Sequence, residues 1–397
     1  MNGPANTAII AILTKGAIKI SSDLIATNVD KGVVTVAKRA YNFNPGPAAL
    51  PLEVLQQAQE EFVDFQGIGM SIMEISHRSK QYEQVNDEAQ SLVKELLGVP
   101  AGYQVLFLQG GASTQFAMIP MNFLPQGKAA GYVLTGSWAD KAYTEAKGIG
   151  ETYVAATGEA GGFRSIPAVS DIEARPGSAY VHLTSNETIA GSQFAAYPDT
   201  GSVPLIGDFS SDIMCRPVDV SKFSLLYAGA QKNLGPSGVT LVIVSDELLG
   251  QASKGVPTML RYDTHSKTKS LYNTPPVYSV YIMNLVLKWI KGKGGLEGME
   301  QFNRDKTKLI YDAIDGSGGF YQGLVDANSR SLMNITFALG SEELEKKFIQ
   351  ESEKEGFVGL KGHRDVGHMR ASTYNAVPYE SCKALADFMN EFRQRNG

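Results

Sequence analysis

Seven short apolar segments, separated by polar or amphipathic stretches, are the feature that most constrains how this chain can fold. They are QVLFLQ (104–109), AGYVLT (130–135), ETYVAA (151–156), SAYVHLT (178–184), VPLIGDFS (203–210), FSLLYAG (223–229) and VTLVIVS (239–245). Strands that alternate with helical stretches are typical of a mostly parallel sheet with helices on both faces. The sequence therefore predicts an α/β fold whose large domain holds a mostly parallel seven-stranded sheet.

Helical patterns flank these segments. Apolar residues recur at helical spacing in 51–65 and again in 82–98, where Gly98 ends the pattern. After the glycine-rich stretch 292–295, a long helix at 296–314 precedes a strand at 331–339 and a helix at 341–356. The later elements predict a second, smaller α/β domain at the C-terminal end.

The first forty residues differ from the rest, because they contain no aromatic residue and only a short apolar run without a charged region before it. That pattern does not match a signal peptide, so we interpret 1–40 as an extension of unknown role outside the catalytic fold. We expect a large domain over 51–291. The small domain is expected to comprise 41–50 and 292–397.

Composition narrows the classes of function. The chain has 397 residues, 43% of them apolar and 19% charged, which suits a folded protein of two domains. Its net charge of −5 argues against general nucleic-acid binding. It lacks an apolar run of membrane-spanning length and has only two cysteines, so we expect a cytoplasmic protein in a reducing compartment without membrane contact.

Two residues near consecutive strands point to a specific chemistry. Asp208 ends one apolar strand, and Lys232 follows the next strand among small or uncharged neighbours. Burial there would depress the pKa of the lysine and make it a usable nucleophile, although a solvated loop lysine is the commoner case. An aspartate at the carboxyl end of a strand either caps a helix or faces a ligand. Together the two residues favour a pyridoxal phosphate site, with the lysine as covalent anchor and the aspartate at the ring nitrogen.

Six separated motifs extend this interpretation. YNFNPGPAALP (41–51), EISHRSK (74–80), GDFSS (207–211), YAGAQKNLGPSG (227–238), YNTPP (272–276) and GHRDVGHMRAS (362–372) together resemble the phosphoserine aminotransferases, fold-type-I enzymes of the class-V group. The resemblance runs in order from residue 41 to residue 397. It implies pyridoxal 5'-phosphate as cofactor and amino transfer as activity.

The resemblance also implies roles for individual residues. The turn before Ala112 and Ser113 is glycine-rich and leads into a helix, a setting suited to an anion, and the family uses it for the cofactor phosphate. By resemblance, the catalytic residues are Lys232, Asp208 and Trp138, the last stacked on the cofactor ring. The implied cofactor-binding residues are Ala112, Ser113, Trp138, Thr188, Asp208, Gln231, Lys232, Asn273 and Thr274.

The resemblance also implies a partner subunit and a set of substrate-binding residues. The family's loop at Asn273 and Thr274 completes the phosphate site of the neighbouring subunit, which implies a homodimer. Arginine binds carboxylates and phosphates bidentately, and the resemblance assigns substrate binding to His77, Arg78, His363, Arg364 and Arg370. The roles of Arg330 and His368 are left open. We expect no metal, because the two cysteines are isolated and the histidine spacing does not suit a metal site.

The resemblance implies transfer of the amino group from L-glutamate to 3-phosphohydroxypyruvate, a step of serine biosynthesis, with one site serving both half-reactions. Alternatives remain open: a 4-phosphohydroxythreonine aminotransferase, which needs the same phosphate ligands, or a non-catalytic protein that binds phosphorylated ligands. A desulfurase needs a mobile catalytic cysteine, for which Cys215 and Cys382 are poorly placed. Nucleotide-binding P-loop and GxGxxG patterns are absent.

Overall fold

The computed structural model describes residues 29–30, 33–34, 39–363 and 367–397 and divides the chain into two compact units, Met1–Tyr41 and Asn42–Gly397. In the first unit, the short strands β1 (Val29–Asp30) and β2 (Val33–Val34) pair antiparallel. The second unit carries the architecture described below.

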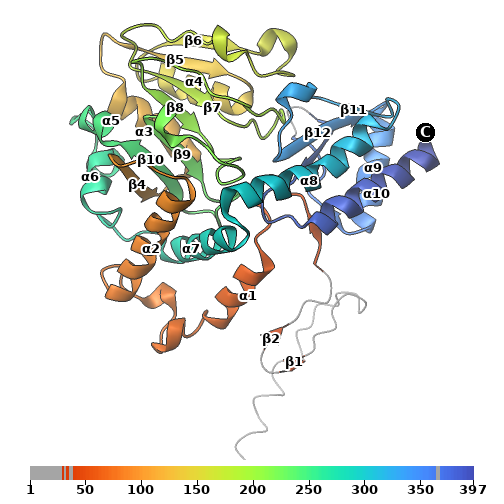
Figure 1. Ribbon diagram of the computed structural model, residues 1–397, viewed down its shortest axis with the longest axis horizontal. Helices are drawn as coiled ribbons and strands as arrows, with labels where there is room; N and C mark the ends of the chain where they lie inside the picture. Colours follow the sequence, from red (N-terminus) through yellow and green to blue (C-terminus); the bar gives the residue numbers. More distant parts are fainter. Residues whose placement is uncertain (1–28, 31–32, 35–38, 364–366) are drawn as a thin grey trace, which may run out of the picture. The chain divides into compact units, whose positions relative to one another are not determined.

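A seven-stranded sheet with the order β4-β10-β9-β8-β7-β5-β6 is the centre of the second unit (Figure 1). Its strands are β4 (Tyr103–Leu108), β5 (Ala129–Leu134), β6 (Glu151–Thr157), β7 (Tyr180–Thr184), β8 (Leu205–Asp208), β9 (Leu225–Gly229) and β10 (Thr240–Ser245). Neighbours are parallel from β9 to β6, whereas β10 runs antiparallel to both β4 and β9. The predicted mostly parallel seven-stranded sheet is confirmed, and each predicted segment supplies one of its strands.

Helices cover both faces of this sheet, because its strands carry apolar side chains on both sides. One face packs against α2 (Lys80–Leu96) and α7 (Val277–Gly292), which lie side by side (Figure 1). The other face packs against α3 (Gly111–Phe123) and α4 (Ser137–Lys147). Shorter helices around the sheet are α1 (Leu52–Glu60), α5 (Asp246–Gly250) and α6 (Tyr262–Lys267).

Helix α1 is shorter than the pattern over 51–65 predicts, and three of the four apolar residues that defined the pattern are exposed. Leu52, Leu55 and Phe62 are 45%, 36% and 45% exposed, whereas Ala58 is buried. The periodicity thus marks a helix correctly but does not mark a face that packs within this chain. This exposed apolar surface continues into the segment that follows, with Val63 79% exposed.

A second group of elements follows α7 in the chain. The strands β11 (Tyr321–Gly323), β12 (Asn334–Leu339) and β14 (Met369–Ser372) form an antiparallel sheet, and β12 is its central strand. The α-helices of this group are α8 (Gly295–Asp315), α9 (Glu342–Lys354) and α10 (Tyr379–Asn396). The short strands β3 (Tyr41–Asn42) and β13 (Phe357–Val358) form a separate two-stranded sheet. The domain boundaries at 41–50, 51–291 and 292–397 stay a prediction.

Three further observations apply to the described part of the chain. It contains no helix that is both long and apolar enough to cross a membrane. Within the same residues, no cluster of three His, Cys, Asp or Glu side chains could hold a metal ion. Cys215 and Cys382 are both free and buried.

Candidate active site

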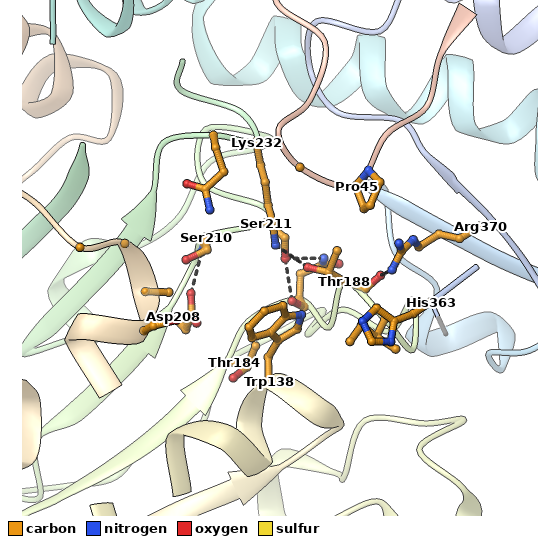
Figure 2. Close-up of a pocket in the computed structure, with 18 residues that line it drawn as sticks. Pro45, Trp138, Thr184, Thr188, Asp208, Ser210, Ser211, Lys232, His363 and Arg370 are labelled. Carbon is orange, nitrogen blue, oxygen red and sulfur yellow. Dashed lines mark hydrogen bonds between the residues drawn. The ribbon is translucent and has the colours of Figure 1, made fainter. Parts of the chain in front are cut away.

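A cavity of about 370 Å³ lies where β7, β8 and β9 end. Ligands in open parallel sheets bind at the carboxyl ends of the strands, and this cavity follows that rule. The predicted residues that line it are Ala112, Ser113, Trp138, Thr188, Asp208, Gln231, Lys232, His363 and Arg370. Figure 2 shows Lys232 and Trp138 entering the cavity from different elements.

Lys232 lies in the turn between β9 and β10, and its side chain crosses the cavity. Its ammonium donates a hydrogen bond to the Thr188 hydroxyl, with 2.6 Å between Nζ and Oγ1. In the described residues no carboxylate lies within ion-pairing distance of Nζ, and burial lowers the pKa of Lys232 to about 8 despite the opposing charge of Asp208. Gly46 fits this arrangement, because a Cβ at that position would approach Cγ of Lys232 to 3.3 Å. The lysine is thus closely packed, and a minor fraction of it is unprotonated at physiological pH.

Asp208 is the last residue of β8 and is buried. Burial raises the pKa of its carboxyl group, and hydrogen bonds from Ser210 and Tyr227 together with the charge of Lys232 oppose that rise. The Ser210 backbone N–H donates to Oδ1 at 2.8 Å (Figure 2). A buried carboxylate held in this way is suited to pair with a cationic group on a ligand.

Trp138 is positioned by a carboxylate that the sequence analysis did not identify. The two backbone N–H groups of Trp138 and Ala139 donate to the Glu187 side chain at 3.3 and 2.9 Å. Because these groups lie in the first turn of α4, Glu187 caps a helix whose own N-cap, Gly136, has no side chain to do so. A Cβ at Gly136 would lie 2.8 Å from the Glu187 carboxyl carbon, so the glycine leaves room for this contact. Burial raises the pKa of Glu187 to about 7.

The N-terminus of α3 forms another wall of the cavity. The helix has thirteen residues, and its N-cap Gly110 provides no side-chain hydrogen bond. Gly110 has a φ of +93°, and a Cβ there would lie 2.0 Å from the Thr114 hydroxyl, so the tight turn requires glycine. The free N–H groups and the helix dipole suit an anion beside Ala112 and Ser113.

The cavity fits the cofactor that the resemblance implies. It combines an anion site for a phosphate, a buried carboxylate for a ring nitrogen and an amine for an aldehyde. Two buried polar atoms that line it, Thr184 Oγ1 and Trp138 Nε1, have no hydrogen-bond partner among the described residues. Their unmet hydrogen-bonding capacity is what a polar ligand would satisfy.

Four predicted residues lie outside the cavity of their own chain. His77 is half-buried and Arg78 is exposed, in the segment just before α2. Asn273 lines a different cavity, which Gly110 also lines, and the Thr274 carbonyl accepts a hydrogen bond from Gln109 at 3.2 Å. Arg364 lies outside the described residues.

Two residues whose roles were left open have partners elsewhere. Arg330 forms a bidentate ion pair with Asp315, both nitrogen–oxygen distances being 2.7 Å. His368 Nδ1 lies 2.8 Å from the Glu345 carboxylate. Neither of the two basic side chains lines the cavity.

The sequence analysis missed several residues of the site. Thr184 and Ser210 line the cavity and lie at the ends of predicted strands, where their position was a usable signal. Glu187 does not line the cavity but holds Trp138, and its being the one charged residue in the segment SNETIAG (185–191) was a second signal. Pro45 and Gly46 come from a loop far away in the sequence, and only the tertiary fold reveals their place in the site.

Comparisons with known proteins agree with this geometry. A family model described as aminotransferase class-V matches residues 40–385. The phosphoserine aminotransferase of Niallia circulans is 65% identical over 362 residues, which cover 91% of this chain and 100% of that protein. The phosphoserine aminotransferase of Lysinibacillus sphaericus is 56% identical, with 91% and 100% covered.

Solved structures give the same result. The phosphoserine aminotransferase from Bacillus circulans subsp. alkalophilus superposes with a TM-score of 0.90 at 65% identity, covering 90% of this chain and 99% of that one. A PLP-bound phosphoserine aminotransferase from Trichomonas vaginalis has a TM-score of 0.83 at 36% identity, with 89% and 100% covered.

Proposed function

We propose, on the premise that this chain belongs to the class-V aminotransferase family, that it transfers the amino group of L-glutamate to 3-phosphohydroxypyruvate. The reaction is reversible, yields 3-phospho-L-serine and 2-oxoglutarate, and belongs to serine biosynthesis. The enzyme is a transaminase that depends on pyridoxal phosphate. The observation that carries the proposal is that Lys232, Asp208, Trp138 and Arg370 all line the same cavity.

The cofactor would be held by residues of that cavity. Lys232 would anchor it covalently and Asp208 would pair with its ring nitrogen. The N–H groups near Ala112 and Ser113 would bind its phosphate, and Trp138 would contact its ring. Thr188 and Gln231 line the same cavity and would complete the contacts. When bound, pyridoxal phosphate supplies an aldehyde that receives the amino group and a protonated ring that accepts electrons from the substrate Cα.

Lys232 would also move the proton. A buried amine with a pKa of about 8 is partly unprotonated near neutral pH, so it can take a proton from the substrate Cα and return it. Thr188 fixes the position of the amine through the 2.6 Å hydrogen bond. Because one cavity would serve both half-reactions, the kinetics are expected to be ping-pong.

Cationic side chains would orient the substrates. Arg370 is buried, donates to the Thr188 carbonyl at 3.2 Å, and has an Nε without a partner among the described residues. A guanidinium held on one side and free on the other is suited to bind a carboxylate. His363 lines the same cavity, and Arg364 would assist from outside the described residues.

A homodimer would explain the residues that lie outside their own cavity. His77, Arg78, Asn273 and Thr274 would serve the site of the neighbouring subunit. Exposed apolar side chains in the segment just before His77 support this arrangement, since a folded chain rarely leaves many such side chains uncovered. They are Leu52, Leu55, Phe62, Val63, Met70 and Met73.

Mixing two inactive variants tests the shared site. Lys232→Ala removes the anchor and Arg78→Ala removes a substrate ligand, so each pure protein is expected to be nearly inactive. If Arg78 acts across the interface, dimers formed from both variants contain one intact site, and a random equal mixture recovers about a quarter of wild-type activity. If Arg78 acts within its own chain, mixing after dissociation and reassociation recovers nothing.

Absorbance spectroscopy of the purified enzyme tests the reaction itself. We expect the absorbance of the lysine-bound cofactor to disappear when L-glutamate is added and to return when 3-phosphohydroxypyruvate follows. No change with glutamate would overturn the proposal in favour of a binding protein. Neither that role nor 4-phosphohydroxythreonine amino transfer is favoured by the named relatives. We propose the cytoplasm as its location, which the two free cysteines support.

A further inference from the structure

Three polar side chains lie on the same face of the central sheet, behind the cavity. His182, Asp208 and Tyr227 belong to the neighbouring strands β7, β8 and β9. In the parallel register Asp208 pairs with Tyr227, and His182 pairs with Ile206, two residues before Asp208. Because side chains alternate along a strand, all three point to the side that carries α3 and α4.

These side chains follow one another across the three strands. Asp208 and Tyr227 are register partners, and the Tyr227 hydroxyl is placed to lower the pKa of the Asp208 carboxyl group by hydrogen bonding. On its other side, the same hydroxyl lies 3.0 Å from His182 Nε2. All three residues are at most 4% exposed, so bulk water does not compete for these contacts.

The chemistry of the three groups fixes the direction of the hydrogen bonds. An ionised carboxylate can only accept, so a hydrogen bond between these two register partners requires the Tyr227 hydroxyl to donate to Asp208. The phenol oxygen can then only accept from His182, which requires the proton of the neutral imidazole to be on Nε2. His182 Nδ1 is buried without a partner among the described residues, which agrees with a bare nitrogen there.

We propose that Tyr227 and His182 are positioning residues that hold Asp208 in its ionised form, with protons directed from His182 Nε2 to the Tyr227 oxygen and from that oxygen to the carboxylate. This inference rests on the proposed role of Asp208 as partner of the cofactor ring nitrogen. It assigns a task to two buried residues that do not line the cavity.

The surroundings explain why such support is needed. Burial raises the pKa of Asp208 and thereby favours the neutral acid, which could not stabilise a protonated ring nitrogen. A hydroxyl donor and the Ser210 N–H oppose that effect. Burial also lowers the pKa of His182 to about 3, so the imidazole stays neutral and its tautomer stays defined.

Nitrogen NMR of the holoenzyme with labelled histidine tests the direction of the series without measuring activity. We expect His182, assigned by comparison with the His182→Gln spectrum, to show the Nε2–H tautomer. A proton on Nδ1 would overturn the proposal while leaving the proposed function intact. Loss of the glutamate-dependent absorbance change in the wild type would instead overturn the function.

Kinetics of a matched pair of variants test the consequence. Tyr227→Phe removes the hydroxyl placed beside Asp208, whereas Tyr132→Phe removes an equally buried hydroxyl whose hydrogen-bond partner is Tyr180, at 2.8 Å. A hydrogen bond to a charged group is worth a ten- to hundredfold change, so we expect kcat of Tyr227→Phe to fall by about that factor with KM for glutamate changed less than about threefold. The absorbance of its bound cofactor should shift as the ring nitrogen loses its proton.

Tyr132→Phe, the control, should keep wild-type kcat and cofactor absorbance even if it loses as much thermal stability as Tyr227→Phe. In the histidine pair, His182→Gln retains an N–H donor near the position of Nε2 and should preserve most of kcat, whereas His182→Leu should resemble Tyr227→Phe. Equal effects of Tyr227→Phe and Tyr132→Phe on kcat and absorbance would show a general packing role and overturn the proposal.

Discussion

Lys232 and Lys306, two lysines of the described residues whose pKa is lowered, lie in regions that differ in access. Lys232 extends into the cavity and makes one hydrogen bond, to Thr188. Lys306, on α8, is completely buried and donates to three backbone carbonyls, those of Tyr374, Val377 and Asn375, at 2.7, 3.1 and 3.5 Å. Burial lowers the pKa of both, to about 8 for Lys232 and about 7 for Lys306.

The comparison shows that a lowered lysine pKa does not identify a catalytic residue. Lys306 has the larger pKa shift, yet its ammonium group is saturated by the loop that precedes α10 and its side chain is 0% exposed. Lys232 has unused hydrogen-bonding capacity and space in front of it. Contact with a cavity and unused hydrogen-bonding capacity distinguish a reactive amine from a structural one.

The largest effect is expected from Lys232→Ala. Loss of both the anchor and the proton-transfer group should reduce kcat by about 10⁴-fold or more, as measured by 3-phosphoserine formation. Thermal unfolding should show that the variant stays folded. Retention of near-wild-type turnover would contradict the assignment and remove the distinction between the two lysines.

Lys306→Met should have the opposite profile. Methionine fills a similar volume but leaves three buried carbonyls without their donor, so we expect a loss of about 2–4 kcal/mol in the free energy of unfolding. Urea denaturation measures this loss. Turnover at a temperature where the variant is folded should stay within about threefold of wild type, and a much larger loss would assign Lys306 a role in the reaction.

A smaller effect is expected when Lys232 loses its single acceptor. Thr188→Val preserves the shape of the side chain but removes the hydroxyl that favours the charged amine, so the pKa of Lys232 should fall by up to about one unit. Titration of ¹³C-labelled lysine ε-carbons in the cofactor-free protein measures this shift. Thr184→Val removes a nearby hydroxyl that does not contact Lys232, so a comparable shift there would point to a general change in polarity.

The smallest effect is a change of slope in the pH dependence of stability. The folded-state pKa of Lys306, about 7, lies below the ordinary lysine value, so between these two values the unfolded chain binds more protons than the folded one. Stability should therefore rise with pH through that interval. Denaturation of wild type and Lys306→Met at several pH values should show a steeper rise in the wild type, because Lys232 contributes equally to both proteins, and parallel curves would contradict it.

The strands of the sheet could be predicted because each is a compact apolar run. Their order could not, since β10 lies beside β4, a strand far away in the sequence, and runs antiparallel to it. Helix α7 gave no amphipathic signal, because nine of its residues are buried and it has no extended polar face. The predicted helix at 296–314 was correct, but nothing in its sequence distinguished Lys306 from its solvated neighbours.

The residues of the site were likewise predictable where local sequence marks them and unpredictable where their role depends on distant segments. Lys232 and Asp208 were identifiable because local sequence places each at a strand end, and the motifs that resemble the family supplied the remaining candidates. Glu187 escaped because its role depends on the first turn of α4, which the sequence alone does not bring near it. Tyr227 and His182 were apolar-strand residues in the sequence and became partners of Asp208 only through the strand register.

The antiparallel direction of β10 has a consequence for how the chain reaches its native state. Strands β9 and β10 are joined by the turn that carries Lys232, so their pairing closes only a short loop and costs little chain entropy. The pairing of β10 with β4 closes a loop of more than a hundred residues, and such non-local contacts slow folding. The turn that carries Lys232 can thus form locally. The cavity wall at Gly110, which follows β4, reaches Lys232 only after β4 and β10 have paired.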